Sequence, residues 1–310
     1  MSKTVYSIYD TSPKTEQIVA LLAQNNTPKL HLSGLVGSSI SFVIRSIFKK
    51  SELPFLLILN DKEEAAYYLN DLEQMIGDQD VLFYPASFRR PYQIEETDNA
   101  NVLLRAEVLN RINSRKKPAI IVSYPEALFE KVVTRKELDK NTLKVAVGDQ
   151  ISIDFINEVL FEYEFKRVDF ITEPGEFSVR GGIVDVFSFS NDNPYRIEFF
   201  GNEVDSIRTF DVATQLSLEQ QKKIAIIPNV ENKFFQENRE SFLDYISEKT
   251  VLFIQNTEGF LSQLDKQFAK AEEAFDKLSK DIKHATPEQL FLSQEQFIKR
   301  ALDFSVVELA

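Results

Sequence analysis

The sequence of 310 residues lacks cysteine and tryptophan and contains only two histidines, His31 and His284. The absence of cysteine excludes disulfides, thiolate catalysis and cysteine-ligated zinc or iron–sulfur sites. Two histidines leave little material for a histidine-rich metal site or for a Ser-His-Asp triad. We therefore expect this chain to hold no catalytic residue, no cofactor and no metal.

Long apolar runs and positive charge are also scarce. No stretch approaches the roughly 20 apolar residues of a membrane span, and the N-terminus lacks the apolar segment of a signal peptide. The chain has 36 Lys+Arg against 48 Asp+Glu, a formal net charge of −12, which repels the phosphate backbone of nucleic acids. These features predict a cytoplasmic protein whose default partner is neither a membrane nor a nucleic acid.

The sequence does contain ample material for a folded core. It is 43% hydrophobic and 12% aromatic, with 26 phenylalanines, so wholesale disorder is excluded. Domains of about 100–200 residues predict two or three modules for this length.

The first part of the chain alternates buried strands with helices. Apolar runs at 54–59 and 119–122 are typical of buried strands, and further strands are predicted at His31-Leu32 and 81–84. Amphipathic segments separate them, and Asp61 is placed to cap one of these helices. This order predicts a parallel sheet built from βαβ units.

The pattern changes after about residue 125. A helix is predicted over 151–165, followed by strands with tight turns, including 195–200 and 203–210 around the hairpin signal Gly201-Asn202. Beyond them, a strand at 250–254 precedes a long helix whose apolar stripe predicts packing on its own sheet rather than a coiled coil. We therefore predict an α/β domain split by a small inserted α+β module, with the boundaries 1–124, 125–212 and 213–310.

The loop after the first strand resembles a phosphate loop that has lost its chemistry. Residues 34–41 lie over the template G-x-x-x-x-G-K-[ST], and Gly34 and Ser41 fit it. Ser39 stands in place of the second glycine, and Ile40 in place of the lysine that must reach the phosphates. The loop is either a decayed phosphate loop or an ordinary strand–helix turn. Both interpretations predict no ATPase activity.

The hairpin carries an unusual polar face. Strand alternation places Arg196, Glu198 and Phe200 on one face, with the apolar residues on the other. A two-residue turn pairs Glu203 with Phe200 and Asp205 with Glu198. An aromatic side chain beside arginine is the composition enriched in protein–protein hot spots.

The charge around this face leaves two interpretations open. Residues 151–210 contain 12 Asp+Glu and 5 Lys+Arg, a net charge of −7, so Arg180 and Arg196 lie in an acidic neighbourhood. They either reach an acidic partner or form ion pairs within the chain, in which case Phe200 fills a gap in a two-sided sheet.

Several segments also carry a family resemblance. These segments are Gly34 to Ser38, Ala127-Leu128, Arg167 to Asp169, Glu173 to Phe187, Tyr195 to Arg208, Phe210-Asp211 and Thr214-Gln215. They resemble the amino-terminal region of the bacterial transcription-repair coupling factor family, Mfd, and more distantly the excision-repair protein UvrB. The resemblance covers roughly residues 30 to 230 and is most specific over 167–215.

This resemblance implies a fold, a partner and a site. It implies a UvrB-like nucleotide-binding-type domain whose phosphate loop is degenerate, split by an insert that docks onto the damage-recognition ATPase UvrA. The family's UvrA-contacting positions match Arg180, Arg196 and Phe200. The implied function is a non-catalytic module that brings nucleotide excision repair to stalled RNA polymerase, with polymerase and DNA bound by parts of a longer protein, of which we expect this chain to be a fragment.

Two alternatives remain open at this stage. One is a UvrB-like, DNA-dependent ATPase or helicase domain, which requires nucleotide binding at residues 34–41. The other is a structural or autoinhibitory role, in which the rest of a longer protein covers the hairpin face.

Overall fold

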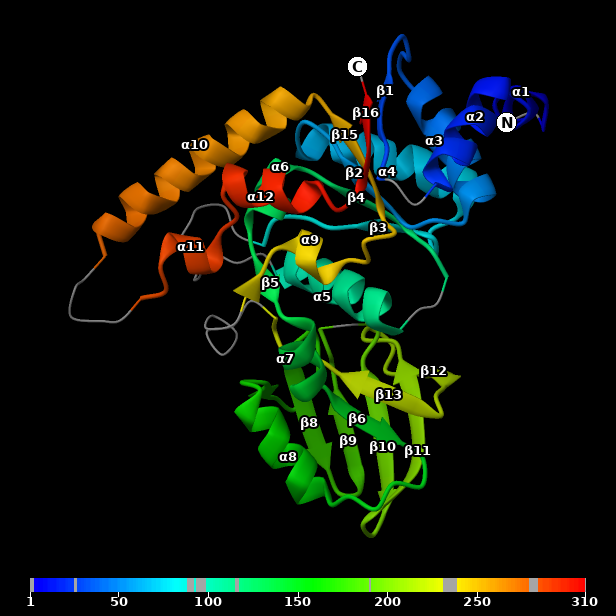
Figure 1. Ribbon diagram of the computed structural model, residues 1–310. Coiled ribbons are helices and arrows are strands. Elements are labelled where there is room, and N and C mark those ends of the chain that lie inside the picture. Colours follow the sequence, from blue (N-terminus) through cyan, green and yellow to red (C-terminus); the bar gives the residue numbers. More distant parts are fainter. Residues whose placement is uncertain are drawn as a thin grey trace. The chain divides into compact units, whose positions relative to one another are not determined.

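A computed structural model describes the protein in two compact units (Figure 1). The parallel-sheet unit comprises residues 1–97, 111–132 and 236–310, and the inserted unit comprises residues 98–110 and 133–235. The predicted α/β class with an inserted α+β module is thus confirmed. The residues described are 3–24, 27–87, 92, 99–114, 117–189, 191–230, 239–278 and 284–309.

The parallel-sheet unit is built on a six-stranded sheet in which every neighbouring pair is parallel. The apolar run at 55–58 lies in its middle, and all four side chains are fully buried, as expected for a strand covered on both faces. In spatial order the strands are β1 (Lys29–Leu32), β16 (Ser305–Leu309), β15 (Val251–Gln255), β2 (Phe55–Ile58), β4 (Ile120–Ser123) and β3 (Val81–Phe83).

One strand of this sheet was not predicted from the sequence. β16 lies between β1 and β15 and pairs with both along its length. Its five residues lack the long apolar run of a central strand, because the strand begins with Ser305 and contains Glu308. The sheet is therefore completed by a segment from the far end of the chain.

Helices flank the strands of this unit, and Asp61 caps α4 as predicted by accepting a hydrogen bond from the Glu64 backbone N–H at 2.8 Å. The apolar stripe of α10 packs on its own unit as predicted, since Leu264 and Ala271 are buried. The helices are α1 (Lys3–Asp10), α2 (Pro13–Leu22), α3 (Ser39–Ser51), α4 (Lys62–Ile76), α6 (Pro125–Phe129), α9 (Phe242–Tyr245), α10 (Thr257–Asp276), α11 (Pro287–Leu290) and α12 (Gln294–Ala301). The division between the units passes through α5 (Asn99–Ser114) and β5 (Val132–Val133). The remaining strand, β14 (Arg239–Glu240), pairs with β5.

The inserted unit is built on a second six-stranded sheet, which is antiparallel except between β7 and β8. Its strands, in spatial order, are β12 (Ser217–Gln220), β11 (Glu203–Phe210), β10 (Tyr195–Phe200), β9 (Ile183–Val186), β8 (Glu176–Arg180) and β7 (Lys166–Arg167). The unit also contains α7 (Arg135–Lys140), α8 (Ile153–Glu162) and the antiparallel pair β6 (Leu143–Ala146) and β13 (Lys223–Ile226).

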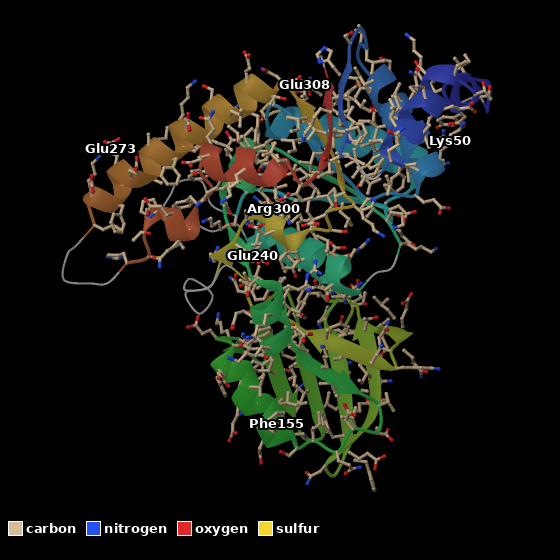
Figure 2. All side chains as sticks on the ribbon, viewed as in Figure 1. Lys50, Phe155, Glu240, Glu273, Arg300 and Glu308 are labelled. Carbon is tan, nitrogen blue, oxygen red and sulfur yellow. The ribbon has the colours of Figure 1, made fainter. Side chains whose placement is uncertain are left out.

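The two faces of this second sheet differ in chemistry. Phe177, Ile197 and Val204 are fully buried on one face, where Phe161 of α8 packs edge-on against Phe177 with 5.2 Å between ring centroids. The other face carries polar side chains together with the buried Phe210, over whose ring Arg196 lies. The helix at 153–162 was predicted, but Phe155 is exposed and its neighbour Ile156 is buried, so the apolar face lies one residue further along (Figure 2).

The compact inserted unit is longer than the predicted insert of residues 125–212, because β12 and β13 follow residue 212. In the described ranges, no helix combines the length and the apolar character needed to cross a membrane.

Candidate functional site

The hairpin of β10 and β11 shapes the candidate site. Gly201 adopts a φ of +64°, a conformation that glycine adopts without steric cost, and Phe200 pairs with Glu203 as predicted. The predicted pairing of Glu198 with Asp205 is wrong, because Glu198 pairs with Ser206 and the register shifts before the next pair. Asp205 is the extra residue of a β-bulge, a feature common beside functional sites.

Phe200 stands almost free at the end of this hairpin. It is 83% exposed, although a phenylalanine in a sheet normally packs against neighbours. The interpretation in which it fills a gap in a two-sided sheet is therefore wrong. A large exposed aromatic side chain at a hairpin tip is instead suited to contact another molecule.

Asp185 organises the polar face beside the hairpin. Its register partner on β10 is Arg196, and its side chain is only 2% exposed. Arg196 Nε donates to Asp185 Oδ1 at 2.7 Å and Arg196 Nη2 donates to Oδ2 at 2.9 Å. Arg180 Nη2 donates to the same Oδ2 at 2.5 Å. One buried carboxylate thus holds both arginines, and such bidentate, charge-assisted bonds fix their orientation.

The two arginines differ in how far they reach solvent. The Arg180 side chain is 42% exposed, and its guanidinium carbon lies 5.4 Å from the ring centroid of the exposed Phe170. The Arg196 side chain is 16% exposed, and its guanidinium carbon lies 4.4 Å from the centroid of the buried Phe210. Arg180 therefore offers a charge to a partner, whereas Arg196 offers mainly one edge.

The electrostatics of Arg196 follow from this geometry. Its hydrogen bonds to Asp185 raise the pKa of the guanidinium further above its usual value, and this effect outweighs the opposing effect of burial. Ion pairing within the chain, one of the two interpretations left open by the sequence, is thus what the structure shows for both arginines. It does not remove Arg180 from solvent.

Two residues of this face were missed by sequence reasoning. Asp185 is an acid between buried valines in β9, and pairing β9 with β10 across the sheet would have placed it opposite Arg196. Phe170 lies in a loop, where no periodicity marks it. A second ion pair joins Arg208 to Glu198, which also accepts from Ser206 Oγ at 2.8 Å, so neighbouring charges on this face are neutralised in pairs.

The loop that resembles a phosphate loop follows β1 and leads into α3. Ser39 Oγ donates to the Val36 carbonyl oxygen and accepts from the Val36 backbone N–H, both at 2.8 Å. The hydroxyl that replaces the template glycine is therefore engaged within the loop. Ile40, which replaces the template lysine, is buried. Within the described part of the chain, no group of three acidic or histidine side chains is placed to hold a metal ion.

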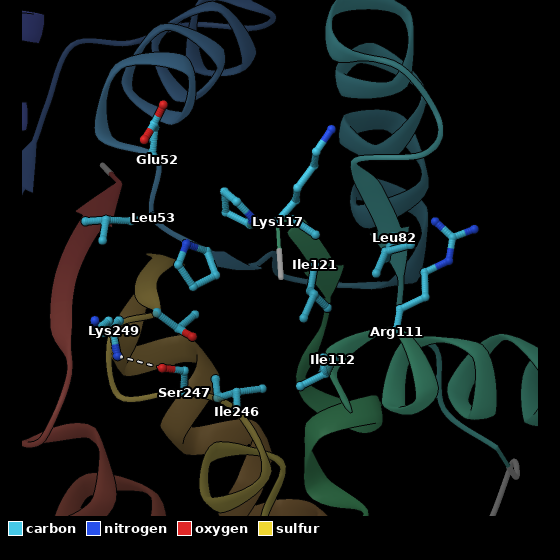
Figure 3. A pocket seen from close by; sticks show the side chains of 14 residues that line it. Glu52, Leu53, Leu82, Arg111, Ile112, Lys117, Ile121, Ile246, Ser247 and Lys249 are labelled. Atoms are coloured by element: carbon cyan, nitrogen blue, oxygen red, sulfur yellow. Dashed lines mark hydrogen bonds between the residues drawn. The ribbon is translucent and has the colours of Figure 1, made fainter. Parts of the chain in front are cut away.

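A separate pocket of about 380 Å³ lies at the amino ends of strands of the parallel sheet, whereas the loop that resembles a phosphate loop follows the carboxyl end of β1 (Figure 3). Its lining includes Pro54, Ala119 and Thr250, which directly precede β2, β4 and β15, whereas residues 33–38 follow β1. Open α/β sheets bind nucleotides beyond the carboxyl ends of their strands. This largely apolar pocket is therefore distinct from the position that a phosphate loop serves.

The inserted unit matches a known family. Residues 143–232, which include all three predicted site residues, match the family described as the UvrB interaction domain. Together, the parallel-sheet unit and this match define an α/β protein whose inserted unit is similar to the UvrB interaction domain.

The chain is also similar to transcription-repair-coupling factors of several bacteria. It is 32% identical over 198 residues to the transcription-repair-coupling factor of Bacillus subtilis, an alignment that covers 64% of this chain and 17% of that protein. The corresponding factor of Myxococcus xanthus is 29% identical over 218 residues, covering 68% of this chain and 18% of the relative. That of Escherichia coli is 27% identical over 197 residues, covering 64% and 17%.

The resemblance to the transcription-repair coupling factors is thereby confirmed. The chain spans less than a fifth of the length of these curated relatives, with 17% or 18% of each covered.

Proposed function

We propose that this chain docks onto UvrA through the face of the inserted unit that carries Arg180, Arg196 and Phe200, and that it catalyses no reaction itself. The observation that carries the proposal is the 83% exposure of Phe200 on the same strand face as Arg196. The match of residues 143–232 to the UvrB interaction domain supports it, as does the family resemblance at the same three positions.

The three residues contribute differently to docking. Phe200 is the apolar anchor, since an aromatic side chain buries about 150–250 Å² when it is covered. Arg180 forms a charge-assisted hydrogen bond to an acidic group of UvrA with its exposed guanidinium. Arg196 presents its accessible edge in an orientation that Asp185 has already set, which lowers the entropic cost of ordering it on binding.

The role follows from the relatives. Within a longer protein that resembles the transcription-repair-coupling factors, such a module brings nucleotide excision repair to stalled RNA polymerase in the cytoplasm. Other parts of that protein contact polymerase and DNA. In this proposal residues 1–124 and 213–310 are the two parts of a UvrB-like α/β domain, and residues 125–212 are its UvrA-binding insert.

The ATPase alternative is not favoured by the loop at 34–41, because the position of the phosphate-binding lysine holds a buried isoleucine. A titration that yielded micromolar affinity for Mg·ATP would reinstate this alternative.

Calorimetric titration of UvrA with the 310-residue chain tests the proposal. Phe200→Ala is expected to weaken binding by at least about 2 kcal/mol, roughly thirtyfold, as for other central aromatic anchors. Arg180→Ala is expected to cost about 1.5–3 kcal/mol if its bond is buried in the complex. The matched control is Phe155→Ala, since Phe155 is an exposed phenylalanine on α8, on the other side of the same sheet.

The melting temperature of each variant separates lost contacts from lost folding, because Phe200 supports little of the core. Unchanged UvrA affinity in both the Phe200 and the Arg180 variant would refute the docking site. Equal losses in the Phe155 control would do the same.

A further inference from the structure

Helices α10 and α12 of the parallel-sheet unit contact each other (Figure 1). Side chains of both helices line a groove between them. It encloses about 740 Å³ and lies outside the inserted unit, so a role for this groove does not depend on the UvrA proposal. The residues that matter here are Asp265, Phe268 and Glu272 from α10, and Glu295, Ile298 and Leu302 from α12 and its C-terminal end.

The spacing of these residues creates one ridge on each helix. Positions 265, 268 and 272 lie three and four residues apart on α10, and so do 295, 298 and 302 on α12 and its end. Residues at this spacing share one face of a helix. Each ridge extends over eight residues, about 10 Å along the helix axis, which matches two turns of another helix laid between them.

The floor of the groove is apolar and open to solvent. Ile298 is 45% exposed and Leu302 is 63% exposed, while Phe268 beside them is half-buried. Single exposed aliphatic residues are normal on a protein surface, but here two of them share one concavity with an aromatic ring. Docking of an apolar helix face would remove all three from water.

The rim of the groove is acidic. The lining of the groove contains three acids, Asp265, Glu272 and Glu295, and one cation, Lys299, so its net charge is −2. Glu272 and Glu295 form no ion pair with another described residue. Acids around an apolar floor are complementary to a partner whose apolar residues are flanked by lysine or arginine.

We propose that this groove binds a basic amphipathic helix of a partner protein. Leucine or aromatic side chains of that helix, at positions i, i+3 or i+4 and i+7, insert between Phe268, Ile298 and Leu302. Lysine and arginine residues beside them pair with Asp265, Glu272 and Glu295. This is the helix-in-groove mode of peptide recognition.

The probe for this site is a 14-residue lysine–leucine peptide whose leucines follow helical spacing, titrated against the full 310-residue chain. Fluorescence anisotropy gives the affinity, and methyl NMR gives the location. We expect shift changes at the Ile298 and Leu302 methyl groups and none at Leu218, an exposed leucine of the inserted unit. A peptide of the same composition with its leucines spread around the helix should bind at least about tenfold more weakly.

Matched variants separate the groove from the general acidity of the chain. Combined Asp265→Lys, Glu272→Lys and Glu295→Lys should weaken binding about tenfold to a hundredfold, because each reversal replaces an attraction with a repulsion. Leu302→Lys should weaken it about tenfold through the apolar floor. Glu158→Lys on α8 changes an exposed acid in the other unit and should leave the affinity unchanged relative to the unaltered chain.

Three results would overturn the inference. The first is full affinity in the groove variants, with melting curves that show intact folding. The second is equal binding of a glutamate–leucine peptide of the same pattern, which would remove the role of charge. The third is a dimer in sedimentation that Leu302→Lys dissociates, because the groove would then be an interface between two copies of this chain.

Discussion

At the scale of single residues, the proposed docking face depends on one buried acid. Asp185 receives three hydrogen bonds from Arg180 and Arg196, so neither arginine needs to be oriented by the partner. The arrangement resolves the ambiguity that composition leaves, since an arginine paired within the chain still presents its outer edge. Phe200 is 83% exposed, so its proposed role rests on its accessibility to a partner.

Asp185→Asn tests this organisation. It leaves two guanidinium groups without their shared carboxylate, and removing one partner of a largely buried ion pair costs about 3–5 kcal/mol of unfolding free energy. We expect the free energy of unfolding, measured by urea denaturation, to fall by about 3 kcal/mol, at the lower end of this range, because Arg180 is exposed enough to be solvated again. We also expect weaker UvrA binding.

The control is Asp205→Asn, which changes an exposed acid of β11, two strands away from Asp185, and should alter the free energy of unfolding little. Equal stability of the two variants would show that Asp185 does not hold the arginines in place.

At the scale of elements, the strands and helices follow the local pattern, while details of face and register do not. The hairpin turn at Gly201-Asn202 was predicted, but the bulge at Asp205 was not. The reason is that a bulge depends on how two strands twist against each other and not on either strand alone. The exposed Phe155 of α8 illustrates the same limit, since helical spacing admits more than one apolar face.

Glu308 connects β16 to β1 and α10 and makes the stability of this part of the sheet depend on pH. The pKa of the Glu308 carboxyl lies below its usual value. The main cause is hydrogen bonding from Thr257 at the start of α10, and the contact with His31 Nδ1 at 3.4 Å adds to it. A carboxylate with a lowered folded-state pKa contributes stability above its unfolded-state pKa and loses it as the pH falls through the folded value.

Glu308→Gln should therefore lower the melting temperature at pH 7 by about 1–2 °C, a modest effect because the side chain is partly exposed. The difference from the unaltered chain should shrink below about pH 4, near the ordinary glutamate pKa. Melting curves from about pH 3 to about pH 8 measure it, and a difference that grows towards low pH would contradict the assignment.

At the scale of the whole molecule, the parallel sheet joins the two ends of the sequence. β1 and β15 are both hydrogen-bonded to β16 rather than to each other. The middle of the chain, in turn, forms the inserted unit. The residues proposed to bind UvrA thus belong to a compact unit of their own.

Deletion of residues 304–310 should abolish cooperative unfolding of the parallel-sheet unit, because it removes a strand flanked on both sides and exposes the backbone groups of two neighbours. Circular dichroism during heating and limited proteolysis measure the effect. Deletion of residues 1–10 is the control of similar length, since it removes α1 and leaves every strand of the sheet. A cooperative transition at an unchanged temperature after the 304–310 deletion would contradict the role of β16.

The sequence by itself determined the fold class, most strands of both sheets, the hairpin turn and the presence of Ile40 at the lysine position of the phosphate-loop template. These features rest on residues close together along the chain, such as the apolar run at 55–58 and the loop at 34–41. Only the tertiary structure decided that β16 completes the sheet and that Asp185 holds both Arg180 and Arg196. Such pairings join segments that local periodicity treats separately, because their free energy comes from burial and hydrogen bonds formed only when the chain has folded.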